Sequence, residues 1–305
     1  MKVIVFGCQQ IAVDFISYLT SLKNIELPLI VSSEFPIDKT YNYKSVLEQA
    51  RALNIDVVNA LKITDKLVET IRQINPEIIF SVYYRRIFPK QLLSIPKLGC
   101  VNVHPSLLPK YRGMVPTAWA IMNAEKETGV TIHLMDEGID TGDILVQKEF
   151  EIHNDETGYQ LNIRAMKIGF ELLKENFFKI IEKKLTPKKQ TGTGRLFGKL
   201  KAKYIIDWHQ NAENIRNLIR VRANPYVPAE TLLFNRYLLI NKASKVKDKK
   251  YAIQHIGRII DILNDDKLVV SCADGCLLLE EYKIVPALTD LEKASYINVG
   301  NRFCQ

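Results

Sequence analysis

Short apolar segments alternate with amphipathic segments from the N-terminus to Glu182, and this alternation constrains the fold more than any other feature of the chain. The apolar runs have strand length, the segments between them have helical periodicity, and the last is one long amphipathic helix pattern. The strand patterns include Lys2–Phe6, Leu27–Val31, Glu77–Val82 and Val101–His104. Strands that alternate with helices predict an α/β domain with a Rossmann-like, mostly parallel sheet.

The pattern changes after Lys203, where short strand patterns follow one another with turn residues such as Asp274-Gly275 between them. This spacing predicts a small antiparallel barrel or sandwich of the size of an OB fold. We therefore expect an α/β domain over residues 1–184, a basic linker over 185–205 and a β-barrel-like domain over 206–305.

Positive charge is concentrated in one segment. Lys plus Arg exceeds Asp plus Glu by 42 − 34 = 8 in this 305-residue chain, and Lys183–Lys203 holds basic residues without an acidic one. Thr186-Pro187 and the glycines within this segment favour a solvated linker, and binding of a polyanion is the alternative.

The five cysteines are odd in number and scattered, so they predict no disulfide framework. Cys272 and Cys276 lack the second Cys or His pair that a structural zinc site needs, and we expect no metal. No apolar run approaches the roughly 18 residues of a membrane span, and the N-terminus lacks a signal-peptide pattern. We expect a cytoplasmic protein.

The chemistry is predicted between Ile79 and Leu145. Asn102 and His104 are two residues apart at the end of a strand pattern, so their side chains share one face. Asp140 lies in an acidic turn between two strand patterns that predict a hairpin. An amide can donate to an oxyanion, an imidazole can move a proton, and a carboxylate can support the imidazolium. The alternative is that these polar residues only cap strand ends. We expect His133 to be structural.

The segments Asn102-Val-His-Pro-Ser-Leu-Leu-Pro-Lys-Tyr-Arg-Gly113 and Glu127-Thr-Gly-Val-Thr-Ile-His-Leu-Met-Asp-Glu-Gly-Ile-Asp-Thr-Gly142 closely resemble the folate-dependent formyltransferase family. Members of this family formylate methionyl-tRNA, glycinamide ribonucleotide or nucleotide-linked amino sugars. The resemblance implies a catalytic trio of Asn102, His104 and Asp140, with N10-formyltetrahydrofolate as formyl donor and a primary amine as acceptor. It also implies that a protonated His104 and Asn102 stabilise the carbonyl oxygen while Asp140 supports the imidazolium.

The resemblance further implies two binding regions. The folate is expected to lie against a loop and a turn, made of Arg86, Ile87, Phe88, Asp136, Glu137, Gly138 and Ile139. Polar and aromatic side chains are candidates for holding the acceptor, namely Tyr83, Tyr84, Lys110, Arg112 and Trp119.

The choice of acceptor depends on two segments. Tyr83-Tyr-Arg-Arg86 resembles the sugar-nucleotide members, especially the formyltransferase half of the enzyme that modifies UDP-4-amino-4-deoxy-arabinose. The loop Ser32–Asn42 has only Lys39 as a base, where tRNA-formylating members carry a basic insertion. Met114 and Pro105 depart from the arabinose-type enzyme, which has Arg and Gly there.

On this basis we expect a nucleotide-linked amino sugar as the acceptor, in lipopolysaccharide or O-antigen biosynthesis. We expect no nucleic-acid or membrane partner, and the sequence is compatible with a homodimer. The alternative is methionyl-tRNA, which the positive charge and the C-terminal domain favour. Hydrolysis of formyltetrahydrofolate and non-catalytic binding of a polyanion are further alternatives.

Overall fold

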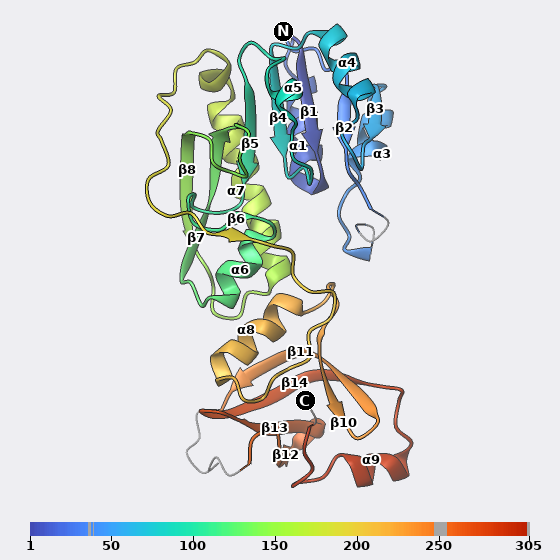
Figure 1. Ribbon diagram of the computed structural model, residues 1–305. Helices are drawn as coiled ribbons and strands as arrows, with labels where there is room; N and C mark the ends of the chain where they lie inside the picture. Colours follow the sequence, from blue (N-terminus) through green and yellow to red (C-terminus); the bar gives the residue numbers. More distant parts are fainter. Residues whose placement is uncertain (36–37, 39, 247–254, 304–305) are drawn as a thin grey trace. The chain divides into compact units, whose positions relative to one another are not determined.

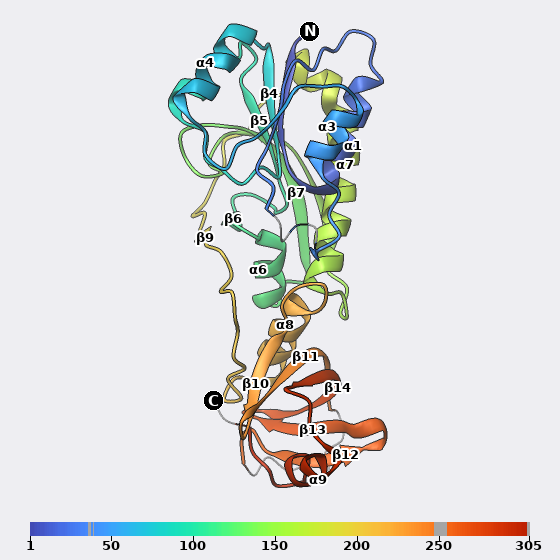
Figure 2. The same cartoon turned by 90° about the vertical axis from the view of Figure 1, so that its right-hand side faces the viewer.

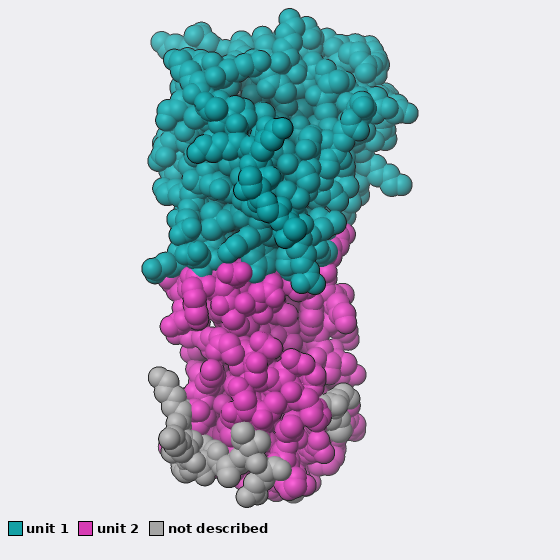
Figure 3. All heavy atoms as spheres, turned by 60° about the vertical axis from the view of Figure 1, so that its left-hand side comes forward, with its two compact units in different colours: residues 1–117, 127–151, 162–198 teal, residues 118–126, 152–161, 199–305 magenta. Residues whose placement is uncertain are grey.

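The computed structural model describes residues 1–35, 38, 40–246 and 255–303. The chain forms two compact units, which Figure 3 colours separately. Unit 1 comprises Met1–Thr117, Glu127–Glu151 and Asn162–Gly198, and unit 2 comprises Ala118–Lys126, Ile152–Leu161 and Lys199–Gln305. Lys39, the basic residue of the loop discussed above, lies outside the described residues.

Unit 1 is built on a seven-stranded sheet in the order β3-β2-β1-β4-β5-β7-β8 (Figure 1). Its first five strands are parallel, and β7 and β8 continue it in antiparallel pairing. The strands are β1 (Val3–Gly7), β2 (Ile30–Ser32), β3 (Val57–Asn59), β4 (Ile78–Val82), β5 (Cys100–His104), β7 (Glu127–Leu134) and β8 (Ile144–Glu151). This confirms the predicted Rossmann-like, mostly parallel sheet and the predicted hairpin around the acidic turn.

Helices cover both faces of this sheet, and for that reason the central strands β1 and β4 are buried along their whole length (Figure 2). On one face, Phe15 of α1 packs against Phe80 of β4 and Phe177 of α7. On the other face, Leu67 and Ile71 of α4 belong to a core that includes Phe6. Full burial of side chains of this size contributes about 2 kcal/mol each. The helices are α1 (Gln9–Thr20), α3 (Val46–Ala52), α4 (Asp65–Ile74), α5 (Lys90–Leu93), α6 (Pro116–Met122) and α7 (Gly158–Ile181).

Local signals explain where these helices begin and end. The Thr64 hydroxyl accepts a hydrogen bond from the Leu67 amide and caps α4, which ends at Asn75 in a left-handed conformation before Pro76. Ser45 caps α3 in the same way. Short polar side chains at the start of these helices, and Asn75-Pro76 at the end of α4, therefore set their boundaries.

Residues 184–198, called the strap below, run along unit 1. Within the strap, β9 (Leu196–Phe197) pairs in parallel with β6 (Arg112–Gly113). Lys188 and Ile144 exchange backbone hydrogen bonds of 2.8 Å in both directions. These contacts place the strap beside the turn that carries Asp140.

Unit 2 contains a five-stranded antiparallel sheet in the order β10-β11-β14-β13-β12. Its apolar face packs around Trp208, whose indole N–H donates to the Thr231 hydroxyl at 3.0 Å. The elements are α8 (Ala212–Arg222), β10 (Ala229–Leu233), β11 (Arg236–Lys245), β12 (Ile259–Leu263), the 3₁₀ turn η1 (Asn264–Asp266), β13 (Lys267–Cys272), β14 (Gly275–Val285) and α9 (Asp290–Tyr296). The predicted β-rich C-terminal domain is confirmed.

Cys272 and Cys276 are buried thiols on either side of the β13–β14 hairpin turn. Among the described residues, no three His, Cys, Asp or Glu side chains are grouped so that they could hold a metal ion. Within the same residues, no helix combines the length and the apolar character needed to cross a membrane.

Candidate active site

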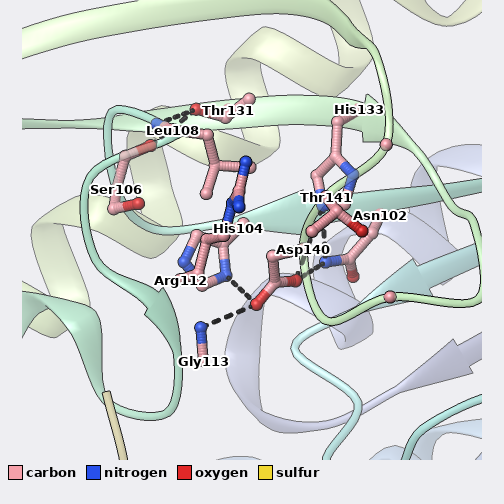
Figure 4. Close-up of polar contacts among 12 residues, drawn as sticks. Asn102, His104, Ser106, Leu108, Arg112, Gly113, Thr131, His133, Asp140 and Thr141 are labelled. Carbon is pink, nitrogen blue, oxygen red and sulfur yellow. Dashed lines mark hydrogen bonds and ion pairs between the residues drawn. The ribbon is translucent and has the colours of Figure 1, made fainter. Parts of the chain in front are cut away.

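The three residues that the sequence singles out lie next to one another in unit 1 (Figure 4). Asn102 and His104 come from β5, and Asp140 comes from the turn between β7 and β8. The Asn102 amide Nδ2 donates to Asp140 Oδ1 at 3.2 Å. The other carboxylate oxygen, Oδ2, lies 3.5 Å from His104 Nδ1. The structure thus brings the predicted trio into contact.

The Asp140 carboxylate is held by more than these two side chains. The backbone N–H of Gly113 donates to its Oδ2 at 2.8 Å, and His133 Nε2 lies 3.6 Å from its Oδ1. Burial acts to raise the pKa of Asp140, but His104, His133 and the Gly113 N–H together hold that pKa well below its usual range. Asp140 is therefore an anion at neutral pH.

His104 is almost completely buried, with 4% of its surface exposed. Its Nε2 lies 2.8 Å from the backbone oxygen of Tyr111. Because a carbonyl can only accept, we assign the ring proton to Nε2, which leaves the lone pair of the neutral ring on Nδ1, facing Asp140. Burial lowers the pKa of His104 below its ordinary value, against the opposing effects of Asp140 and the Tyr111 carbonyl. With its pKa lowered in this way, the imidazole is neutral at pH 7. The protonated His104 that the resemblance implies during formyl transfer stays a prediction.

His133 is also part of this cluster, although we expected it to be structural. It lies directly opposite Asn102 in the antiparallel β5–β7 pair, and its Nε2 is 3.1 Å from Asn102 Nδ2. Its Nδ1 lies 2.7 Å from the Leu134 carbonyl, so Nδ1 carries the proton and Nε2 accepts from the amide. The two hydrogens of the Asn102 amide are thereby directed at His133 and Asp140. The alternation of the strand pattern showed on which face of the sheet His133 lies. The pairing of His133 with Asn102 depends on the register between β5 and β7, which the sequence does not show.

A second residue missed by the sequence reasoning is Gln190 in the strap. Its side-chain amide donates to the backbone oxygens of Asp140 and Gly142, each at 2.8 Å. Its oxygen accepts from Arg112 Nε at 3.1 Å and Nη2 at 2.6 Å. The sequence gives no local sign of this, because the segment is polar and was expected to be a linker.

An exposed ion pair lies beside the two segments expected to bind folate. Lys90 Nζ, at the start of α5, lies 2.8 Å from a carboxylate oxygen of Glu137. Asp136 shapes the turn by accepting hydrogen bonds from the Gly138 N–H and the Thr141 hydroxyl. Ile87 and Ile139 are 65% and 37% exposed, so each segment offers an apolar side chain to a ligand.

Arg86 and Phe88 have different surroundings. The Arg86 guanidinium lies 5.4 Å from the centre of the Phe35 ring, and its buried Nε has no hydrogen-bond partner within the described part of the chain. Phe88 is buried, and its ring centre is 4.6 Å from that of Phe6. Phe88 therefore packs in the core beneath the loop, and Arg86 and Ile87 are the loop residues able to contact a ligand.

The five residues expected to hold the acceptor are distributed unevenly. Arg112 lies in the site through its contact with Gln190, and Lys110 is exposed on the same loop. Tyr84 donates its hydroxyl to the Ala60 carbonyl at 2.9 Å and packs on Phe6, which is a structural arrangement. The remaining two differ: the buried Tyr83 hydroxyl has no partner within the described residues, and Trp119 lies on α6 in the part of that helix assigned to unit 2.

Comparison with known proteins identifies the family. The formyl transferase family model matches residues 32–176, and the model of the formyl transferase C-terminal domain matches residues 199–287. The chain belongs to the formyl transferase family. A methionyl-tRNA formyltransferase of Clostridioides difficile (strain 630) is 36% identical over 290 residues, covering 93% of this chain and 92% of the relative. One from Clostridium novyi (strain NT) is 34% identical over 307 residues, covering 99% and 97%.

Among solved structures, an N-formyltransferase from Helicobacter canadensis, in complex with folinic acid and dTDP-3-aminofucose, has a TM-score of 0.72 and 25% identity. The match covers 92% of this chain and 100% of that one. Family membership makes this chain a folate-dependent formyl transfer enzyme with N10-formyltetrahydrofolate as the formyl donor. The resemblance noted from the Asn102–Gly113 segment is confirmed.

Proposed function

We propose that this enzyme transfers the formyl group of N10-formyltetrahydrofolate to the amine of methionyl-tRNA. The observation that supports the tRNA acceptor is the near full-length similarity to methionyl-tRNA formyltransferases at 36% and 34% identity. These relatives favour what the sequence analysis kept as the alternative over the nucleotide-linked amino sugar that it preferred. The short loop at residues 32–42 suggested a sugar, but positive charge is available instead in residues 183–203.

The site residues have separate roles in this reaction. N10-formyltetrahydrofolate, when bound, supplies the formyl carbon that the amine attacks. His104 is neutral and carries a lone pair on Nδ1, so Nδ1 takes up the proton that the amine loses. Asp140 Oδ2, 3.5 Å away, stabilises the imidazolium that results. Nδ1 then returns this proton to N10 of the folate as the bond between N10 and the formyl carbon breaks and tetrahydrofolate leaves.

Asn102 is the donor for the negative charge that develops on the formyl oxygen. Both of its amide hydrogens are directed at neighbours in this structure, to Asp140 at 3.2 Å and to His133 at 3.1 Å. The amide must therefore exchange one of these bonds for the formyl oxygen. If the amide leaves Asp140, that carboxylate keeps its hydrogen bond from the Gly113 N–H.

The folate is proposed to lie between the residues after β4 and the turn before β8. Lys90, two residues after the first segment, forms an exposed ion pair with Glu137 of the turn. Ile87 and Ile139 expose apolar surface suited to a planar ring. Asp136 is engaged in shaping the turn, so backbone groups are left to read the polar edge of the ring.

A nucleotide-linked amino sugar is the second candidate acceptor. The Helicobacter canadensis enzyme, solved with dTDP-3-aminofucose, matches over its whole length at a TM-score of 0.72. The segment Tyr83–Arg86, which resembles the sugar enzymes, also favours this candidate. With this acceptor, Asn102, His104 and Asp140 would act on the sugar amine in the same roles.

An acceptor panel tests the proposal. The protein is incubated with N10-formyltetrahydrofolate and, in parallel, with methionyl-tRNA and with dTDP-, UDP- and GDP-linked 3- or 4-amino sugars. We expect formylmethionyl-tRNA as the main product, and its formation should require His104. Formylated sugar without formylmethionyl-tRNA would replace our proposal with the second candidate.

A further inference from the structure

Gln190 connects the strap to the main chain of the turn that presents Asp140. Its Nε2 donates to the carbonyl oxygens of Asp140 and Gly142, and its Oε1 accepts two hydrogen bonds from Arg112. One side chain thus fixes two points of the turn, on either side of Thr141. It does so from a position fifty residues further along the chain.

The turn needs this support because of its backbone conformation. Asp140 has a φ of 54°, in the left-handed region, which is unfavourable for a residue other than glycine. Its carboxylate is aimed at His104 and Asn102 in this conformation. Gln190 holds the carbonyl oxygens of Asp140 and Gly142, each by a hydrogen bond of 2.8 Å. These two bonds oppose a change of Asp140 to the right-handed conformation, which would turn its carboxylate away.

The strap is itself fixed on both sides of Gln190. Lys188 is bonded to Ile144, and Leu196–Phe197 pairs with Arg112–Gly113. The Phe197 ring packs on Tyr111 with ring centres 4.8 Å apart. Gly194 lies so close to Arg112 that a Cβ there would be 2.6 Å from the guanidinium carbon. The Gln190 amide therefore acts from a defined position.

We propose that Gln190 is a positioning residue for formyl transfer, which holds the Asp140 turn so that the carboxylate faces His104 and Asn102. The proposal rests on the role of Asp140 given under the proposed function. Neither the family match nor the predicted catalytic trio assigns this role to a strap residue. Gln190 acts through Asp140 and does not contact the reacting atoms.

Two substitutions separate the contacts of Gln190. Gln190→Ala removes all of them, whereas Gln190→Glu keeps an acceptor for Arg112 and loses the donor to both carbonyls. Thr193→Ala, at an exposed position of the same strap, is the matched control. We expect kcat to fall about 10- to 100-fold in both Gln190 variants, with KM for donor and acceptor within about twofold, because misplacement of a catalytic group acts mainly on the chemical step.

A second readout needs no substrate. The charged or titratable groups that face the His104 ring are Asp140 and His133, and Asp140 raises the pKa of His104. If the carboxylate turns away, the His104 titration midpoint in ring NMR should move to lower pH in Gln190→Ala, which adds no charge, and stay unchanged in Thr193→Ala. Melting temperatures show whether each variant folds, and Gln190→Glu carries the test if Gln190→Ala does not.

Wild-type kcat in either Gln190 variant, with an unchanged His104 midpoint in Gln190→Ala, would overturn the proposal, since the contacts with both carbonyls are lost in each variant. Equal losses in Thr193→Ala would also overturn it, because they would reflect general damage to the strap. The NMR readout keeps this test apart from the proposed function: an enzyme that does not formylate tRNA would still report whether Gln190 positions Asp140.

Discussion

At the scale of single residues, the Asp140 carboxylate is the point where the contacts of the site converge. Its two oxygens together face Asn102, His104, His133 and the Gly113 N–H. Removing either member of the His104–Asp140 pair leaves the proton from the amine without its acceptor or without the charge that stabilises it. His104→Ala and Asp140→Ala should each lower kcat by about 10²-fold or more.

Circular dichroism of these two variants should match the wild type, because the surrounding strands are supported by the apolar core of the sheet. Turnover close to that of the wild type in either variant, measured by single-turnover formyl transfer, would remove that residue from the mechanism.

The protonation of His104 gives a second prediction at this scale. Its pKa is lowered mainly by burial, so the ring NMR titration should have its midpoint below about 6.5, the value of an exposed His. Asp140 opposes this lowering, so Asp140→Asn should move the midpoint lower still. Asp136→Asn in the same turn is the control, since Asp136 does not contact the ring. A midpoint above that of an exposed His would contradict the neutral resting state.

The same shift has a consequence for stability. The folded chain binds a proton at His104 more weakly than the unfolded chain does. The contribution of the neutral ring is therefore fully present above about pH 6.5 and is lost as the pH falls below that value.

Sequence reasoning predicted the three residues that the structure brings together, but it did not predict the contacts of His133 and Gln190 with them, for a physical reason. Asn102, His104 and Asp140 lie in long contiguous segments that resemble a family. The contact of His133 with Asn102 depends on the register between β5 and β7, and that of Gln190 depends on how the strap folds back. Neither arrangement leaves a local pattern in the chain.

At the scale of elements, the turn between β7 and β8 is packed tightly against its own strands. A Cβ on Gly142 would overlap the backbone carbonyl oxygen of Leu134 and lie 2.8 Å from its carbon. Gly142→Ala should therefore shift the turn, lower kcat at least about tenfold and cost roughly 1–3 kcal/mol of unfolding free energy.

Gly275→Ala is the control for this substitution. Gly275 also lies at a hairpin turn, but a Cβ there meets no atom within 4 Å. Activity and denaturant midpoint of Gly275→Ala should equal those of the wild type. Equal effects of the two substitutions would show that the packing at Gly142 is not special.

The order of strands and helices in unit 1 followed from alternating apolar patterns, because buried parallel strands and amphipathic helices leave strong periodic signals. The strap had no such signal. Its strand β9 is two residues long and pairs with a strand of equal length, so no alternation can develop. Its polar residues were therefore taken for a linker, although the part up to Gly198 belongs to unit 1.

At the scale of the whole molecule, the excess of eight positive charges bears on the acceptor. A tRNA substrate makes many phosphate contacts, and each contact releases counterions on binding. KM for methionyl-tRNA should therefore rise about tenfold or more between roughly 50 and 200 mM salt, while KM for N10-formyltetrahydrofolate changes much less.

A pair of charge variants locates this effect. Lys199→Ala with Lys201→Ala, in the basic segment, should raise KM for tRNA and reduce its salt dependence. Lys167→Ala with Lys174→Ala, exposed on α7, removes the same charge and should have the smaller effect. Equal effects of the two double variants would assign the dependence to net charge alone.

The central claim is that formyl transfer at Asn102, His104 and Asp140 serves methionyl-tRNA. A competition experiment tests it most directly: methionyl-tRNA and the best nucleotide-linked amino sugar are mixed with limiting N10-formyltetrahydrofolate, and the ratio of their kcat/KM values is taken from the ratio of products. We predict a ratio above about 10³ in favour of methionyl-tRNA, with both products lost in His104→Ala. A ratio of that size corresponds to a difference of about 4 kcal/mol in transition-state binding. A ratio below one would contradict the claim and identify the amino sugar as the acceptor.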